Sequence, residues 1–256
     1  RIGGESGVGK SRLLDELRVQ AMVAGAIVLR GQSVTGTGLT YKLWRDSLRR
    51  LVLSVDITDI EAGILKAIIP DMPTLLDRSV PPVPQLEGRG EQRRLINTIV
   101  DVFRRIDGPF VLLLEDLHWS AESLEPLKAL TTITADLPLL IVGSYRDEEQ
   151  PYLPNELPDM TLLKLDRLDV DGIAELSASM LGEVGKAKPI VDLLQRETEG
   201  NTYFIVEVVR ALAEDAGNLE EIGVTTLPSQ VFTGGVRQVI DRRLKRIPKS
   251  ARPLLR

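Results

Sequence analysis

The chain of 256 residues has no cysteine and only one histidine. Without cysteine the protein forms no disulfide bond and no thiolate metal site, which agrees with a reducing compartment, and we expect a cytoplasmic location. One histidine leaves almost no route to a structural zinc site or to a histidine-based hydrolase. The sequence also lacks a secretory signal and any apolar run near the roughly 20 residues of a membrane-spanning helix, so no membrane partner is expected.

Charge and composition are those of an ordinary globular protein. Hydrophobic residues make up 43% and charged residues 27% of the chain, and its net charge is −5. This acidic balance predicts no direct contact with nucleic acid. Residues 237–256 are an exception, since arginine and lysine are opposed there only by Asp241. This basic run indicates the solvated face of a helix, with a phosphate-contacting surface as the alternative.

The most informative segment is Gly4–Ser11, which fits the phosphate-binding pattern G-x-x-x-x-G-K-[ST] at every fixed position. Apolar residues follow it at helical spacing, so the loop is expected to open an amphipathic helix. Glycines let the backbone curl around phosphate oxygens, and the helix offers its free amides and positive dipole end to the anion. The alternative is a glycine-rich turn that only caps a helix. Motif and context together favour phosphate binding.

Each residue of this loop has an expected role in binding ATP or ADP with Mg²⁺. Lys10 is expected to reach the β- and γ-phosphates, and Ser11 to place its hydroxyl on the metal ion. The predicted nucleotide-binding residues are Gly4, Glu5, Ser6, Gly7, Val8, Gly9, Lys10, Ser11 and Arg12. Only three residues precede the loop, too few for a full strand. We therefore expect a truncated first strand and a chain that is an internal piece of a larger polypeptide.

Apolar runs without alternation predict strands that are buried on both faces of a sheet. They alternate with helical patterns such as residues 95–106, which Asp107-Gly108-Pro109 ends. The predicted strands are 26–31, 110–116, 139–143 and 162–165. This alternation predicts the α/β fold class with a parallel, doubly wound sheet. Further helices are predicted over 43–52 and 123–130, and the proline-rich residues 70–84 are predicted to be loop and short helix.

The strand 110–116 ends in Glu115-Asp116 and resembles a Walker B element. A strand of this kind delivers its acids beside the phosphates, where one helps to hold Mg²⁺ and the other orients or polarises the attacking water. We therefore predict Glu115 and Asp116 as catalytic residues and, together with Ser11, as metal-binding residues. The alternative is that two acids simply end a core strand.

A further polar residue is expected at the same edge of the sheet, since ligands gather at the carboxyl ends of parallel strands. Arg146 follows the strand 139–143 and is predicted as a catalytic residue that reads the γ-phosphate with its planar guanidinium. The alternative is a surface arginine paired with Asp147 or Glu148. For His118, close behind the acid pair, a position next to the nucleotide and a structural hydrogen bond are equally open.

From about Asp166 the strand signals stop and helical patterns follow. Apolar residues recur at intervals of three and four within 173–181, 190–194, 204–212 and 236–247. An α/β part is therefore expected to precede an all-helical part.

Four strings of residues together resemble the ATPase module of STAND proteins, the signal-transduction ATPases related to AAA+ proteins. They are Gly4–Ser11, Leu112–Trp119, Val142–Arg146 and Glu199–Phe204. The likeness is nearest to bacterial modules in large LuxR-type transcription regulators, in multidomain Ser/Thr kinases and beside nucleotide cyclases. The first string is specific to nucleoside triphosphatases. The E-D-x-H-W and G-N-x-x-F strings narrow the resemblance from nucleoside triphosphatases in general to the STAND group.

The resemblance implies a sheet of strand order 5-1-4-3-2, a helical lid and a winged-helix domain. We expect the nucleotide-binding α/β domain over 1–166, the lid over 167–226, and a linker or the start of the winged helix over 227–256. The resemblance also implies an ATP/ADP switch that self-associates in its ATP form and acts on effector domains of the same polypeptide.

Two residues depart from the family pattern. The first acid of the Walker B pair is most often aspartate, and here it is the longer Glu115, so the division of work between Glu115 and Asp116 stays open. The lid motif usually carries proline after Gly-Asn, and Thr202 stands in its place, which puts the expected adenine contact there in doubt. The family's base-binding segment upstream of the loop is absent from this sequence.

Three functions agree with these features. The preferred one is a regulatory switch that binds ATP and hydrolyses it slowly. The second is a nucleotide-dependent scaffold or oligomerisation module without significant turnover, against which the two acids argue weakly. The third is a mechanical AAA+ machine, which the acidic balance and the lack of an obvious pore loop disfavour.

Overall fold

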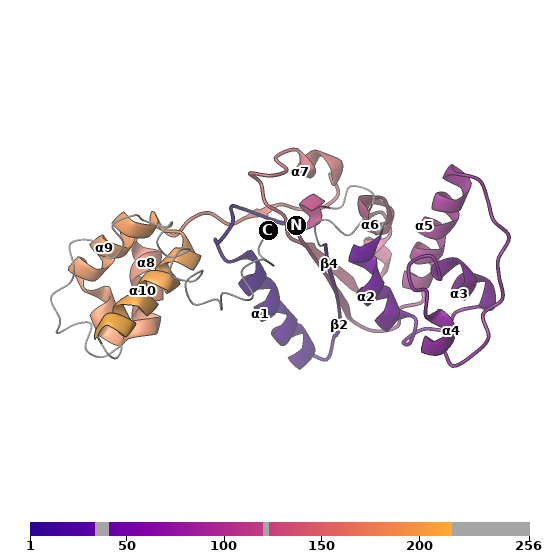
Figure 1. Ribbon diagram of the computed structural model, residues 1–256, viewed down its shortest axis with the longest axis horizontal. Coiled ribbons are helices and arrows are strands. Elements are labelled where there is room, and N and C mark those ends of the chain that lie inside the picture. The colour runs from indigo at the N-terminus through magenta and orange to yellow at the C-terminus, as the bar shows by residue number, and fades with distance from the viewer. Residues whose placement is uncertain (34–40, 120–122, 217–256) are drawn as a thin grey trace, which may run out of the picture. The chain divides into compact units, whose positions relative to one another are not determined.

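The computed structural model describes residues 1–33, 41–119 and 123–216. By their internal contacts these residues form two compact units. Of the described residues, the first unit contains Arg1–Glu5 and those within Lys10–Leu165, and the second contains Ser6–Gly9 and 166–216. Figure 1 shows strands flanked by helices in the first unit, and a group of helices in the second.

Parallel strands form the centre of the first unit. β2 (Ile27–Gln32), β3 (Phe110–Glu115) and β4 (Leu139–Gly143) make one sheet with β3 in the middle. In the β2–β3 register the last residues of the two strands, Gln32 and Glu115, are partners. Because the three strands are parallel, their carboxyl ends meet at one edge of the sheet.

A second sheet carries the start of the chain. β1 (Ile2–Gly3) pairs in parallel with β5 (Leu163–Lys164). An isolated parallel bridge links Ile2 to Ser144, just after β4, and the Tyr145 amide donates to the Ile2 carbonyl at 3.1 Å. The α/β class with parallel strands is confirmed. The single sheet of order 5-1-4-3-2 stays a prediction, because the described strands form two sheets joined by this bridge.

The helices of the first unit agree with most of the predicted segments. They are α1 (Lys10–Val23), α2 (Lys42–Leu51), α3 (Asp59–Leu65), α4 (Met72–Leu75), α5 (Arg89–Phe103), α6 (Leu124–Thr131) and α7 (Leu153–Glu156), with 3-10 turns at Leu117–Trp119 and Thr134–Asp136. The sequence did not predict α3, because seven residues show no clear helical period. Within the described ranges, every helix is too short or too polar to cross a bilayer.

A capping box fixes the start of α3. The Glu61 amide donates to the Thr58 hydroxyl at 3.3 Å, and the Thr58 amide donates to the Glu61 carboxylate at 2.8 Å. These reciprocal bonds satisfy two backbone donors at the helix end, which explains why so short a helix forms.

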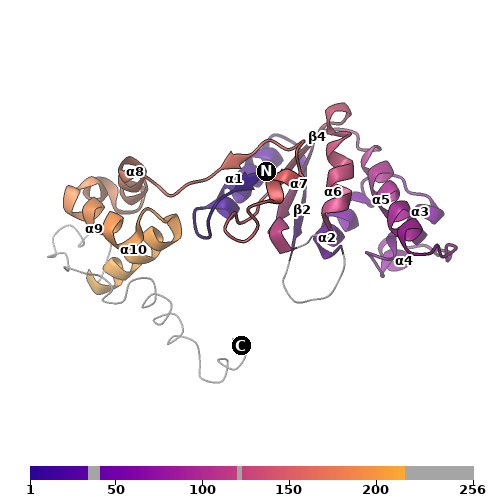
Figure 2. The same cartoon turned by 90° about the horizontal axis from the view of Figure 1, so that it is seen from above.

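β3 is buried along its whole length and packs against different helices on its two faces. Val111 and Leu113 share an apolar cluster with Leu14 of α1. The alternate side chains, Leu112 and Leu114, belong to the main core, which also holds residues of α2, α5 and α6. Figure 1 and Figure 2 both show α1 on one side of the sheet and α2 and α6 on the other. A strand with apolar residues on both faces suits this position.

The second unit is helical. Its elements are α8 (Val170–Leu181), a 3-10 segment (Gly182–Lys186), α9 (Lys188–Thr198) and α10 (Thr202–Ala216). Fully buried Ile173, Leu194 and Ile205 come one from each helix and lie in a common core. Three of the four predicted helices are thus confirmed. The fourth, over 236–247, and the predicted segment 227–256 lie outside the described residues.

The ion pair of Glu61 is expected to make part of the folding stability depend on pH. Arg105 donates to the Glu61 carboxylate at 2.8 Å, and mainly this bond lowers the Glu61 pKa from 4.5 to about 2. A lowered folded-state pKa stabilises the fold above the ordinary value, and this stabilisation is lost as the pH falls toward 2. Glu61→Gln is expected to remove it.

Thermal unfolding midpoints measured between about pH 7 and about pH 3 test this expectation, because stability follows the difference in bound protons. The matched control is Asp101→Asn, which alters an exposed pair with Arg104. Midpoints that fall in parallel for wild type and Glu61→Gln would contradict the assignment.

Candidate functional site

The loop between β1 and α1 has a backbone that requires glycine at two positions. Gly7 has φ +85° and Gly9 has φ +106°, in a region that residues with a Cβ rarely adopt. A Cβ on Gly9 would meet no atom within 4 Å, so its conformation, and not space, requires glycine. At Gly7 an added Cβ would also lie 2.6 Å from the Asn201 Oδ1 atom. The glycine at position 7, which the motif leaves free, is therefore required by this fold.

Lys10 lies against the same loop. It is the first residue of α1 and is only 8% exposed. Its ammonium group donates to the carbonyl oxygens of Gly4 and Glu5, each at 2.7 Å. Burial lowers the Lys10 pKa, and the charge of Glu148 opposes that shift. The ammonium group thus stands beside a turn of backbone and a helix N-terminus, which together suit an anion.

The start of α10 holds the carbonyl groups of the loop. Ser6–Gly9 and α10 belong to the same unit. The side-chain amide of Asn201 donates to the Ser6 carbonyl at 2.9 Å, and the backbone amide of Tyr203 donates to the Gly7 carbonyl at 2.9 Å. Asn201 is only 3% exposed. Asn201, just before α10, and Tyr203, in its first turn, therefore restrain two consecutive peptide groups of the loop.

The two acids at the end of β3 lie in different surroundings. Glu115 is buried and accepts from the Arg30 Nε atom of β2 at 2.6 Å. Asp116 is partly exposed, has φ +58°, and accepts from the Gln32 side-chain amide at 3.1 Å. The neighbouring strand therefore supplies one partner for each acid. Sequence reasoning missed both partners, although two polar side chains in an otherwise apolar strand were the available signal.

Arg146 follows β4, at the predicted edge of the sheet. Its guanidinium donates to the Glu149 carboxylate at 2.6 Å. The other oxygen of that carboxylate lies 3.4 Å from the Nε2 atom of His118, whose side chain is fully buried. The partners considered from the sequence, Asp147 and Glu148, did not include this acid. One carboxylate thus joins the predicted γ-phosphate sensor to the only histidine of the chain.

The charges of Asp116 and Arg146 act on both Lys10 and His118. Burial has the largest effect and lowers the pKa of both Lys10 and His118. The charge of Asp116 raises both pKa values, and the charge of Arg146 lowers both. Charges act in this way over short distances. The structure therefore brings residues from the loop, from the end of β3 and from the end of β4 to one edge.

A family model described as AAA ATPase domain matches residues 2–142, more than half of the chain. The chain belongs to the AAA ATPase domain family. The matched region contains the loop Gly4–Ser11 and the acid pair at the end of β3. No curated protein matches the chain. The protein therefore contains a nucleotide-binding domain of the ATPase type.

AAA ATPase domains typically use Mg²⁺ with the nucleotide, and the donors predicted from the sequence are of the kind that this ion prefers. The Ser11 hydroxyl and the carboxylates of Glu115 and Asp116 are hard oxygen ligands, which Mg²⁺ prefers. Among the residues that the structure describes, no group of three or more acidic, histidine or cysteine side chains could hold a metal. Mg²⁺ usually takes one or two protein oxygens together with phosphates and waters. The residues thus suit a metal shared with the nucleotide.

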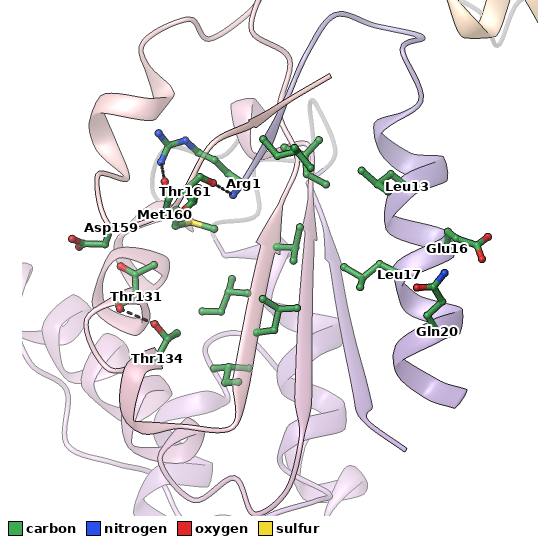
Figure 3. A pocket seen from close by; sticks show the side chains of 16 residues that line it. Arg1, Leu13, Glu16, Leu17, Gln20, Thr131, Thr134, Asp159, Met160 and Thr161 are labelled. Atoms are coloured by element: carbon green, nitrogen blue, oxygen red, sulfur yellow. Dashed lines mark hydrogen bonds between the residues drawn. The ribbon is translucent and has the colours of Figure 1, made fainter. Parts of the chain in front are cut away.

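The AAA ATPase domain also borders an apolar groove of about 530 Å³. Figure 3 shows Leu13 and Leu17 of α1 on one side of it, and Thr131 and Met160 on the other. Leucine, isoleucine and valine of β4 form much of its floor. None of the predicted nucleotide-binding residues lines the groove. An apolar groove of this kind does not suit a triphosphate, so the candidate nucleotide site is the loop.

Asn201 provides a test of how the loop is held. Asn201→Ala removes the donor to the Ser6 carbonyl and the acceptor of the Phe204 amide. We expect amide hydrogen exchange in the loop to become about five- to tenfold faster, because one hydrogen bond contributes about 1 kcal/mol to local opening. The control is Thr202→Val, which removes a longer bond of 3.4 Å to the Val8 carbonyl. Unchanged exchange in Asn201→Ala would show that the bond does not hold the loop.

Proposed function

We propose that this AAA ATPase domain is a regulatory ATP switch of the STAND class, which hydrolyses ATP slowly and thereby resets itself. One observation carries the proposal. Asp116 and Arg146, which follow two different strands, lie within electrostatic reach of Lys10, whose ammonium group binds the glycine-rich loop. A binder of a neutral ligand has no need for this convergence of charges.

The loop and α1 would bind the phosphate chain. Backbone amides of Gly4–Gly9 and the free amides at the start of α1 would donate to phosphate oxygens. The Lys10 ammonium group would exchange its bonds to the Gly4 and Glu5 carbonyls for bonds to β- and γ-phosphate oxygens. Such an exchange replaces neutral acceptors with charged ones, which favours the bound state.

The acid pair and Arg146 would act on the γ-phosphate. Ser11 and Glu115 would hold Mg²⁺, which neutralises phosphate charge when bound. Asp116, the more exposed acid, would orient a water and accept its proton as the water oxygen bonds to the γ-phosphorus and the bond to ADP breaks. Arg146 would leave Glu149 and donate to the γ-phosphate, so that its position reports whether ATP or ADP is bound.

A switch also needs a large difference between its two ligands. Moving the protein almost completely from one state to the other takes about 5.5 kcal/mol of differential preference. Charge-assisted bonds from Lys10 and Arg146 to a γ-phosphate, present only in ATP, could supply a good part of it. Asn201 and Tyr203 donate to the loop, so a change in the loop between its ATP-bound and ADP-bound states would also alter these bonds at the start of α10.

The remaining parts of the proposal follow the resemblance to STAND proteins. We propose one sheet of order 5-1-4-3-2 in a domain over 1–166, a lid over 167–226, and a link to a winged helix over 227–256. The parallel bridge between Ile2 and Ser144 supports the sheet order, because it joins β1 to the end of β4. Self-association with ATP, effector domains in the same polypeptide and a cytoplasmic setting belong to the same proposal.

A second candidate is a nucleotide-dependent scaffold without turnover. The observation in its favour is that Arg146, the predicted γ-phosphate sensor, is bound to Glu149. In this case ATP would serve as a structural ligand, and signalling would come from lid or partner contacts.

Lys10→Ala tests nucleotide binding. We expect it to weaken the affinity for a fluorescent ATP analogue with Mg²⁺ by at least about 100-fold, because a charge-assisted contact to two phosphates is lost. The control is Lys188→Ala, since Lys188 pairs with Asp192 on the surface of α9. Tight binding by Lys10→Ala would remove the assignment of the loop.

Asp116→Asn separates the switch from the scaffold. We expect phosphate release to slow by about 100-fold, because the amide cannot accept a proton, while analogue binding stays within about threefold. Asp136→Asn, in a 3-10 turn after α6, is the matched control. Equal phosphate release by wild type and Asp116→Asn would favour the scaffold.

A further inference from the structure

β2 presents two polar side chains toward the acid pair of β3. Arg30 and Gln32 are two residues apart, so they lie on the same face of the strand. Val28 on that face shares the apolar cluster of Val111 and Leu113, which marks it as the α1 side of the sheet. In the parallel register Arg30 is the partner of Leu113, two residues before Glu115 at the end of β3 and on the same face of the sheet.

Arg30 binds one carboxylate oxygen of Glu115 through two of its nitrogens. Its Nε atom donates to Glu115 Oε1 at 2.6 Å, and its Nη2 atom pairs with the same oxygen. Its third nitrogen, Nη1, donates to Asp15 of α1 at 3.1 Å. The Glu115 side chain is 3% exposed, whereas that of Arg30 is 41% exposed. A single guanidinium therefore links the buried acid to the helix that follows the phosphate-binding loop.

The contact between Arg30 and Glu115 is relevant to the presence of glutamate, and not aspartate, at the first Walker B position. Glutamate has one more rotatable bond than aspartate, so its carboxylate is less well placed by the backbone alone. Two guanidinium nitrogens that bind the same oxygen fix the place of that oxygen with charge-assisted bonds. Arg30 thus restrains the Glu115 carboxylate, whereas the strand backbone alone would restrain the shorter side chain of an aspartate.

We propose that Arg30 is a positioning residue that orients Glu115 toward the Mg²⁺ of the bound nucleotide. Because Arg30 occupies Oε1, the second oxygen of Glu115 is the one left for the metal ion, as outer partners of metal ligands commonly arrange. The inference rests on the proposed function, since it concerns the metal that accompanies ATP. It adds a residue that lies outside the loop, the acid pair and the predicted sensor.

A purely structural ion pair makes a different prediction. If Arg30 only neutralises a buried carboxylate, its loss changes stability and leaves the effect of Mg²⁺ on nucleotide affinity unchanged. If it orients Glu115, the Mg²⁺ effect changes even in a variant that keeps the positive charge. Arg30→Lys is that variant, because lysine retains the charge but not the planar fork.

The experiment compares the affinity for a fluorescent ATP analogue in Mg²⁺ with that in EDTA. In wild type, Mg²⁺ is expected to tighten binding. In Arg30→Lys this gain is expected to fall by about tenfold, as for other outer-shell substitutions, while the affinity in EDTA stays within about twofold. The matched control is Arg18→Gln, which removes another arginine near Asp15, at 3.9 Å, without touching Glu115.

A double-mutant cycle supplies a readout without ligand. Thermal unfolding of Arg30→Gln, Glu115→Gln and the double variant, with neither nucleotide nor metal, is expected to show strongly non-additive shifts, because the two side chains are in contact. In the Mg²⁺ titration the double variant should behave like Glu115→Gln alone, since Arg30 acts through that acid.

The outcomes are distinct. A Mg²⁺ gain in Arg30→Lys equal to that of Arg18→Gln would overturn the inference and leave the proposed function in place. Additive shifts in the thermal cycle would overturn it as well. A wild-type protein that binds no ATP analogue under either condition would overturn the proposed function, and the role of Arg30 in it.

Discussion

The burial of β3 between β2 and β4 is the constraint on which the site depends. Every residue of β3 is buried, and the strand carries apolar side chains to helices on both faces. A strand fixed in this way can hold a carboxylate at its end that solvent scarcely reaches. It also sets the register that brings Arg30 beside Glu115 and leads Arg146 to the same edge. Without the apolar packing of β3, the positions of these polar groups relative to one another would not be fixed.

Three charged side chains at this edge are engaged with partners inside the protein. Lys10 binds the carbonyls of its own loop, Arg146 binds Glu149, and Glu115 binds Arg30. These contacts satisfy groups that would be costly to leave unpaired. A phosphate chain would replace several of them with stronger charge-assisted bonds. The same groups thus stabilise the fold and, in our proposal, become the source of the difference between ATP and ADP.

The sequence predicted the strands and most of the helices because each depends on a local pattern. The apolar run 110–114 and the glycines before Lys10 needed no knowledge of distant residues. α3 was missed because its seven residues are too few for a period, although its Thr58-to-Glu61 capping box was a usable signal. The crowding of Gly7 by Asn201 was not predicted, because Asn201 lies far away along the chain.

By itself, the sequence determined the chemical groups of the site and their order along the chain: an anion loop, two acids at a strand end and an arginine after the next strand. Local spacing and backbone preference are enough for this. Only the tertiary structure decided which distant side chains meet, namely Arg30 with Glu115, Gln32 with Asp116, and Asn201 with the loop. Strand pairing and helix packing bring these distant residues together. A one-residue shift in strand register would move the side chains of a strand to the opposite face of the sheet.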